Sequence, residues 1–127
     1  MLVFQHEVLI VLPKITVYIT NYNYGRYLKK AVESVLNQSE KNYEIIIIDD
    51  GSVDDSKAII EKYRNHKKIK IVMQQNKGLT VSNNLALKLS KGRYIMRLDA
   101  DDYLSKDALK NLSNVLDNKT NVGMVFG

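Results

Sequence analysis

Two groups of aspartates in this sequence have the composition and spacing of a cation-binding site. One lies in DDGSVDD (Asp49, Asp50, Asp54, Asp55) and the other in LDADDY (Asp99, Asp101, Asp102), so half of the 14 acidic residues are gathered in two short segments. Like charges this close repel one another unless a cation lies nearby. Carboxylates suit Mg²⁺ or Mn²⁺, with water and substrate phosphates as the remaining ligands. A D-x-D spacing alone also fits a simple turn.

Alternating strand and helix patterns position these acids. Runs rich in β-branched and aromatic residues predict strands at 15–20, 43–48, 69–73 and 94–98. Helical periodicity lies between them, Ser105 is expected to cap a fourth helix, and VGMVFG at 122–127 predicts a fifth strand. Ser52 and Asp55 have the spacing of a capping box. The pattern predicts an α/β fold, a mostly parallel sheet flanked by helices.

Polar segments follow three of these strands. TNYN (Thr20–Asn23) comes after the first, the Asp49 group after the second and the Asp99 group after the fourth. Parallel strands end at one edge of the sheet, where ligands of such folds bind. We therefore expect the three segments to form one site.

The charge of the chain indicates which classes of partner it can bind. The 127 residues, enough for one domain, include 19 Lys and Arg and no Cys. Outside the two acidic groups the surface is strongly basic, which favours phosphates, nucleic acid or an acidic membrane, or serves solubility alone. Because no basic motif is interleaved with aromatic residues, we expect no nucleic-acid partner. The apolar runs are too short to span a membrane and no signal peptide is recognisable, which predicts a cytoplasmic protein, in solution or peripheral to the inner membrane.

Four linked motifs resemble a known family. The segments ITVYITNYNYGRYLKKAVESVLNQS, YEIIIIDDGSVDDS, NKGLTVSNNLAL and GRYIMRLDADDYLSKDAL follow in the order and spacing of family 2 glycosyltransferases, which have the GT-A fold. The match runs from about residue 14 to residue 127 and covers only the N-terminal, nucleotide-binding half of such enzymes. It implies a Rossmann-like nucleotide-sugar-binding domain at 15–127, truncated before the acceptor half, after an apolar extension at 1–14.

The resemblance also implies roles for individual nucleotide-binding residues. Thr20 and Tyr22 correspond to residues that contact the base and ribose. Asp50 matches the residue that reads the base, often uracil, and Asp49 is its neighbour in the site. Lys77 stands where a basic residue approaches the pyrophosphate, although an exposed loop lysine fits the position equally well.

The D-x-D segment is implied to hold the ribose and the metal. Asp99 corresponds to the acid on the ribose side, Asp101 to the ligand of Mn²⁺ or Mg²⁺, and Asp102 to a supporting metal residue. The sequence departs from the family at Thr20, where proline is usual. It also departs at 82–84, where Ser-Asn-Asn replaces a common Ala-Arg-Asn and a basic residue is missing.

The implied reaction is inverting transfer of a sugar from a nucleoside diphosphate, most often UDP, to a hydroxyl of a glycan, lipid-linked or protein acceptor. The catalytic base is expected in the acceptor half, after residue 127, so we expect this chain alone to be inactive. A catalytically incomplete nucleotide-binding or assembly module shares every motif. A metal-dependent phosphatase is disfavoured, because LDADDY follows the fourth strand rather than the first.

The apolar N-terminus suggests a role for Val8–Leu12. If the strand at 94–98 has an open edge, this short β-branched segment can pair with it. Pairing within the chain would complete the sheet, and pairing between chains would give a homodimer. A frayed tail is the alternative.

Overall fold

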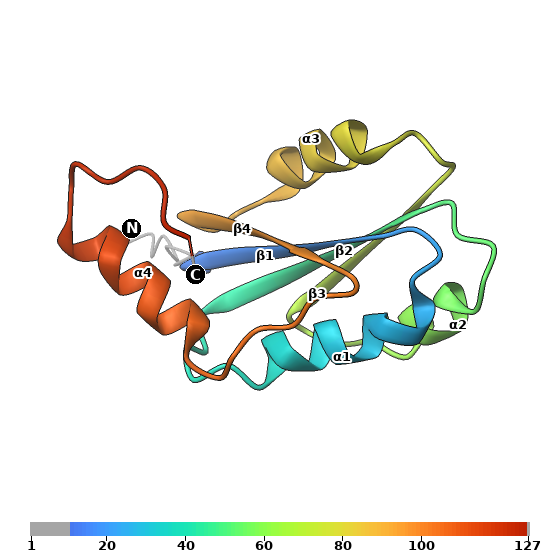
Figure 1. The fold of residues 1–127 in the computed structure, drawn as a ribbon, viewed down its shortest axis with the longest axis horizontal. Helices are drawn as coiled ribbons and strands as arrows, with labels where there is room; N and C mark the ends of the chain where they lie inside the picture. Colours follow the sequence, from blue (N-terminus) through green and yellow to red (C-terminus); the bar gives the residue numbers. More distant parts are fainter. Residues whose placement is uncertain (1–10, 127) are drawn as a thin grey trace, which may run out of the picture.

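A four-stranded parallel sheet organises the protein. The computed structural model describes residues 11–126 (Figure 1). The strands pair in the order β3-β2-β1-β4, and their bounds are β1 Ile15–Asn21, β2 Tyr43–Asp50, β3 Ile69–Gln74 and β4 Tyr94–Asp99. The helices that follow them are α1 Gly25–Leu36, α2 Ser56–Glu61, α3 Leu79–Leu89 and α4 Ala108–Asn118. The predicted α/β class and the first four strands are confirmed.

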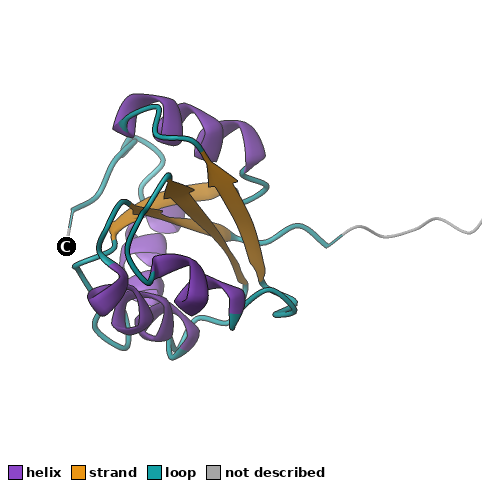
Figure 2. Ribbon diagram, turned by 90° about the vertical axis from the view of Figure 1, so that its right-hand side faces the viewer, coloured by secondary structure: helices purple, strands orange, loops and turns teal. Residues whose placement is uncertain are grey.

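Helices cover both faces of the sheet (Figures 1 and 2). Val17 and Ile19 of β1 point to one face, where they pack in a core with Leu28 of α1 and with residues of α2 and α4. Tyr18 points to the other face, where Ala86 of α3 lies in the second core cluster. Because its side chains are buried on both sides, β2 carries the continuous run of isoleucines at 45–48.

The strand order creates a switch point beside β1. β2 and β3 lie on one side of this strand, β4 lies on the other, and all three pairings are parallel. Helices α1 and α3 lie on opposite faces of the sheet (Figure 1), and each begins just after the carboxyl end of a strand, α1 after β1 and α3 after β3. Ligands of such sheets bind at this place. The register places Thr20 directly beside Asp99 across the β1–β4 pair.

The predicted fifth strand is wrong for the part of it that the structure describes. Residues 122–126 have no strand pairing, and the Val122 amide donates to the Lys119 carbonyl in a turn. Met124 and Phe126 instead line an apolar groove with β4 and α4. The segment lines this groove with largely exposed side chains and without a backbone ladder to β4. Within 11–126, β4 is accordingly an edge strand.

Two predicted helix starts are also wrong. Helix α2 begins at Ser56, so Ser52 is too far upstream to cap it, and its hydroxyl donates to Asp49 instead. Helix α4 begins at residue 108, where the amide bonds to the Ser105 carbonyl rather than to a capping hydroxyl. Ser52 thus holds a loop together instead of starting a helix.

The N-terminal prediction lies largely outside the described part of the chain. Of Val8–Leu12, only residues 11 and 12 are described, and neither lies in a strand. Across 11–126, no helix combines the length and the apolar character that crossing a membrane requires.

Candidate functional site

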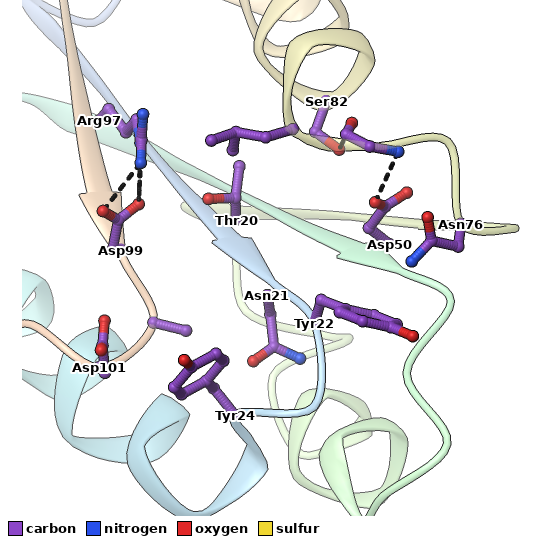
Figure 3. A pocket seen from close by; sticks show the side chains of 13 residues that line it. Thr20, Asn21, Tyr22, Tyr24, Asp50, Asn76, Ser82, Arg97, Asp99 and Asp101 are labelled. Carbon is purple, nitrogen blue, oxygen red and sulfur yellow. Dashed lines mark hydrogen bonds and ion pairs between the residues drawn. The ribbon is translucent and has the colours of Figure 1, made fainter.

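A cleft of about 400 Å³ opens at the switch point (Figure 3). The segment after β1 contributes the two tyrosines, β2 contributes its last carboxylate, and the end of β4 and the residues after it contribute two more (Thr20, Tyr22, Tyr24, Asp50, Asp99, Asp101). The three polar segments therefore meet at one site, as their positions after parallel strands predicted.

Asp50 holds the loop between β3 and α3. Its carboxylate accepts hydrogen bonds from the Lys77 and Gly78 amides at 2.8 and 3.0 Å, and from Gln74 Nε2 at 2.8 Å. Gly78 has φ +88° and ψ 164°, a conformation essentially reserved for glycine. A Cβ on Gly51, the residue after Asp50, would lie 2.6 Å from the Asn76 amide. The carboxylate and the two glycines together fix this wall of the cleft.

Asp49 points away from the cleft and does not line it. Its buried carboxylate accepts hydrogen bonds from Asn21 Nδ2 at 2.7 Å, from the Ser52 hydroxyl at 2.6 Å and from the Ser52 amide at 3.0 Å. Asn21 in turn donates to Ser52 and to Ser56 of α2. The period of two along a strand explains why adjacent aspartates have opposite surroundings. Asp49 braces the loops below the cleft.

Arg97 pairs with Asp99 at the β4 side of the cleft. Both side chains are partly exposed, and the guanidinium donates to the two carboxylate oxygens, with Nε–Oδ1 2.8 Å and Nη2–Oδ2 2.9 Å. Arg97 is the single cationic side chain among the described residues that line the cleft. Arg97 was not among the predicted site residues, although its position two residues before Asp99 on a strand places both on one face.

Asp101 and Asp102 have different surroundings. Asp101 lines the cleft with an exposed carboxylate that makes no hydrogen bond or ion pair within residues 11–126. Asp102 lies outside the cleft, in a neighbouring hollow that it shares with Asp99 and Tyr103. Its amide donates to the Asp99 carbonyl and closes the turn after β4. Of these two carboxylates, that of Asp101 is the one placed to bind a ligand in the cleft.

The donor set fits a hard divalent cation that is shared with a ligand. In the described part of the chain, no three acidic or histidine side chains form a cluster able to hold a metal alone. Asp99 and Asp101 offer oxygen atoms only, and one or two carboxylates are what Mg²⁺ takes when phosphates and water complete its shell. The pair with Arg97 uses one acceptor site on each Asp99 oxygen, so further sites remain for contact with the ion.

Two tyrosines form the outer wall of the cleft (Figure 3). Tyr22 and Tyr24 are 47% and 46% exposed, so flat aromatic faces are available to a base or ribose. The residue between them, Asn23, has φ +58°, and its amide and side chain hydrogen-bond to Ser52 and to the Val53 amide. The loop after β1 is therefore held by the loop after β2.

Lys77 contributes its backbone to the site. Its amide bonds to Asp50, but its side chain is exposed and does not line the cleft, whereas the neighbouring Asn76 and Gly78 do. Asn76, Ser82 and Tyr24 line it without having been predicted. Asn76 belongs to the β3–α3 loop, Ser82 to α3 and Tyr24 to the segment after β1, so no single spacing rule selects them.

Two titratable groups near the cleft have shifted pKa values. Burial raises the pKa of the Tyr18 hydroxyl, while Arg97 on the neighbouring strand lowers it by a smaller amount. The pKa of Asp54 is affected most by desolvation, which raises it, but hydrogen bonds from Ser56 and Gly25 together leave it below its usual value. Asp54 bonds the amides that begin α1 and α2, and so ties these two helices together.

Comparison with known proteins decides the family. The model of "Glycosyl transferase family 2" matches residues 16–127. The chain belongs to glycosyl transferase family 2. The family 2 chain is 42% identical over 99 residues to the chondroitin synthase of Escherichia coli, an alignment that covers 77% of this chain and 14% of that protein.

Solved structures share the fold. The S. aureus TarS fragment 1–349 in complex with UDP-GlcNAc superposes with a TM-score of 0.76 at 31% identity, covering 83% of this chain and 31% of TarS 1–349. The Pyrobaculum calidifontis mannosyltransferase PcManGT, in complex with GDP-Man and Mn²⁺, gives a TM-score of 0.75 at 21% identity, covering 84% of this chain and 33% of that one. At this identity the second likeness is one of fold alone. The chain thus spans about a third of each of these structures.

Proposed function

We propose that this family 2 domain binds a nucleoside diphosphate sugar, with UDP as the nucleotide, for transfer of the sugar to an acceptor hydroxyl. The observation that carries the proposal is the meeting of Tyr22, Asp50, Asp99 and Asp101 at one cleft at the switch point of the sheet. Two further facts support a nucleoside diphosphate sugar as the ligand. The D-x-D segment resembles that of family 2 glycosyltransferases, and the similar TarS structure is a complex with UDP-GlcNAc.

The cleft residues suggest how the donor lies. Tyr22 offers an aromatic face to the base, and such stacking contributes roughly 1–3 kcal/mol per base in other proteins. Asp50 can still accept an N–H from the base, because each carboxylate oxygen has more than one acceptor site. We place the ribose near Asp99 and the diphosphate between Arg97 and Asp101. Arg97 would supply the cation that is missing at position 83.

Asp99 and Asp101 would hold Mn²⁺ or Mg²⁺ together with the diphosphate oxygens. When bound, such an ion neutralises the negative charge that develops on the nucleoside diphosphate as it leaves. In inverting transfer the acceptor oxygen forms a bond to the anomeric carbon, the bond from that carbon to the diphosphate breaks, and a base takes the acceptor proton. We assign the base to no residue of this chain.

Calorimetric titration with UDP tests donor binding. We expect weak binding that strengthens when Mn²⁺ is added, and we expect Asp101→Asn to remove the gain. Asp107→Asn is the matched control, because this exposed aspartate lies before α4 and outside the cleft. Equal UDP affinity with and without metal in the unaltered protein would refute the metal part of the proposal, and no UDP binding at all would refute the whole.

Turnover separates the enzyme from an incomplete nucleotide-binding module. The chain spans 14% of the chondroitin synthase and about a third of TarS 1–349, so we expect it to bind donor and to transfer no sugar by itself. Release of UDP from UDP-GlcNAc, with and without a hydroxyl acceptor, measures this. Efficient transfer by the 127-residue chain would show that the base lies within it after all.

A further inference from the structure

The end of the sheet opposite the cleft is strongly basic. The four segments that lead into the strands, residues 11–14, 37–42, 62–68 and 90–93, carry eight Lys or Arg residues and one carboxylate. Because the strands are parallel, these segments share one side of the molecule, here called the amino-end face (Figure 1). Both aspartate groups lie at the other end, so the protein has a basic pole and an acidic pole.

Most carboxylates near the amino-end face are already engaged. Asp117 of α4 pairs with Lys14 at 2.7 Å, Glu61 pairs with Arg64, and Glu44 accepts from Thr16 and from the Lys91 amide. The remaining acid of the four segments, Glu40, approaches Lys14 and accepts from the Asn42 amide. Few acids are therefore left to neutralise the lysines.

Four lysines of this face have no carboxylate within ion-pair distance in residues 11–126: Lys41, Lys62, Lys67 and Lys91. Lys68 also has none, but its Nζ donates to the Lys41 carbonyl and lies over the Tyr43 ring. The charges of the four lysines are available to a partner, and the field of such a face extends about one Debye length into solvent.

Exposed apolar side chains accompany these charges. Val11 and Leu12, which lead into β1, are 85% and 58% exposed. Phe126 is 86% exposed and lies beside the start of β4, on the groove that also contains Ile15. Apolar side chains beside lysines and arginines are the combination that binds the interface of an anionic bilayer, where the apolar groups enter the headgroup region and the cations meet the lipid phosphates.

We propose that the amino-end face docks on an anionic lipid bilayer. A folded nucleic acid or another polyanion would satisfy the lysines but leave the exposed Val11, Leu12 and Phe126 without a role, so the bilayer accounts for both features. Docking in this orientation turns the acidic cleft away from the membrane, whose negative surface also repels it. The proposal uses none of the cleft residues and does not depend on the proposed function.

Sedimentation with vesicles tests this proposal. We expect the 127-residue protein to bind vesicles of phosphatidylcholine mixed with phosphatidylglycerol, and not vesicles of phosphatidylcholine alone. The double variant Lys67→Gln/Lys91→Gln should bind roughly twenty-five-fold more weakly, because each lysine near an anionic surface contributes roughly a five-fold factor. Leu12→Ser should weaken the binding that persists at high salt.

The control double variant, Arg26→Gln/Lys77→Gln, removes the same charge from the opposite end, where Arg26 lies in the first turn of α1 and Lys77 precedes α3, and should bind nearly as the unaltered protein does. Three outcomes would overturn the proposal: no vesicle binding, an equal loss in both double variants, or tighter binding to single-stranded RNA than to the anionic vesicles. Circular dichroism of each variant establishes that it is folded before binding is compared.

Discussion

Replacing Asp49 by asparagine should destabilise the protein and leave its affinity for UDP unchanged. The carboxylate is 2% exposed and accepts three hydrogen bonds, two on Oδ1 and one on Oδ2. An amide of the same shape has only one accepting oxygen. In either orientation, at least one donor from Asn21 or Ser52 faces an NH₂ group.

The expected loss follows from these contacts. If the amide oxygen occupies the Oδ1 position, the Ser52 amide loses its acceptor, and the two remaining bonds change from charged to neutral acceptors. A hydrogen bond to a charged group contributes about 1.5–3 kcal/mol, so we expect the free energy of unfolding to fall by about 3 kcal/mol. In a domain of this size that corresponds to roughly 10 °C in Tm.

Urea unfolding followed by circular dichroism measures the loss, and calorimetry on the folded variant measures its UDP affinity. Asp50→Asn is the matched control, because it alters the adjacent carboxylate, which also accepts three hydrogen bonds but lines the cleft. It should weaken UDP binding. A change below about 1 kcal/mol for Asp49→Asn, accompanied by weaker UDP binding, would refute the structural role and restore Asp49 to the nucleotide site.

Three further predictions concern the cleft and its supports. Arg97→Gln should lower the affinity for UDP about ten-fold and leave that for uridine nearly unchanged, since a charge-assisted hydrogen bond to phosphate is lost; an equal loss for both ligands in calorimetry would contradict this. Gly78→Ala should lower the free energy of unfolding by about 1–3 kcal/mol, because the backbone angles φ +88° and ψ 164° are strained for any residue with a Cβ. The strain is in the backbone alone, since a Cβ built on Gly78 would have no neighbouring atom within 4 Å. An unchanged Tm would show that the loop has another conformation. The Asp54 carboxylate, whose pKa is lowered from 3.8, stabilises the fold above that value and loses this contribution as the pH falls through its folded pKa. Asp54→Asn should therefore be less stable than the unaltered protein at neutral pH, with the difference shrinking in strong acid; a difference that stays constant down to pH 2 would contradict the assignment.

The strand pattern made the fold and the position of the site predictable. The continuous isoleucines of β2 and the alternation of strands and helices predict a parallel sheet covered on both faces. Parallel strands bring Thr20, Asp50 and Asp99 to the same edge of that sheet. These predictions used only local periodicity and one topological rule, which are properties that a sequence carries directly.

The different roles of neighbouring residues could not be predicted from the sequence. Asp49 and Asp50 have the same chemistry, and only the direction of each side chain makes one a brace and the other a cleft residue. The failed fifth strand has a similar cause, because VGMVFG has the composition of a strand while pairing depends on a neighbour that composition does not reveal. Arg97 was not predicted because it lies inside a strand rather than in one of the polar segments that follow the strands.

The position of β4 in the sheet has a consequence for folding kinetics. β1 pairs with β2 after a single intervening helix, but with β4 only after three helices and two strands have been made. Closing the longer loop carries the larger entropic penalty, so we expect the β1–β4 ladder to be the last to form. The cleft lies across that ladder, with Thr20 on one strand and Asp99 on the other. A folding intermediate that already has most of its core would therefore lack the binding site, and the onset of UDP binding during refolding would mark the final step of assembly.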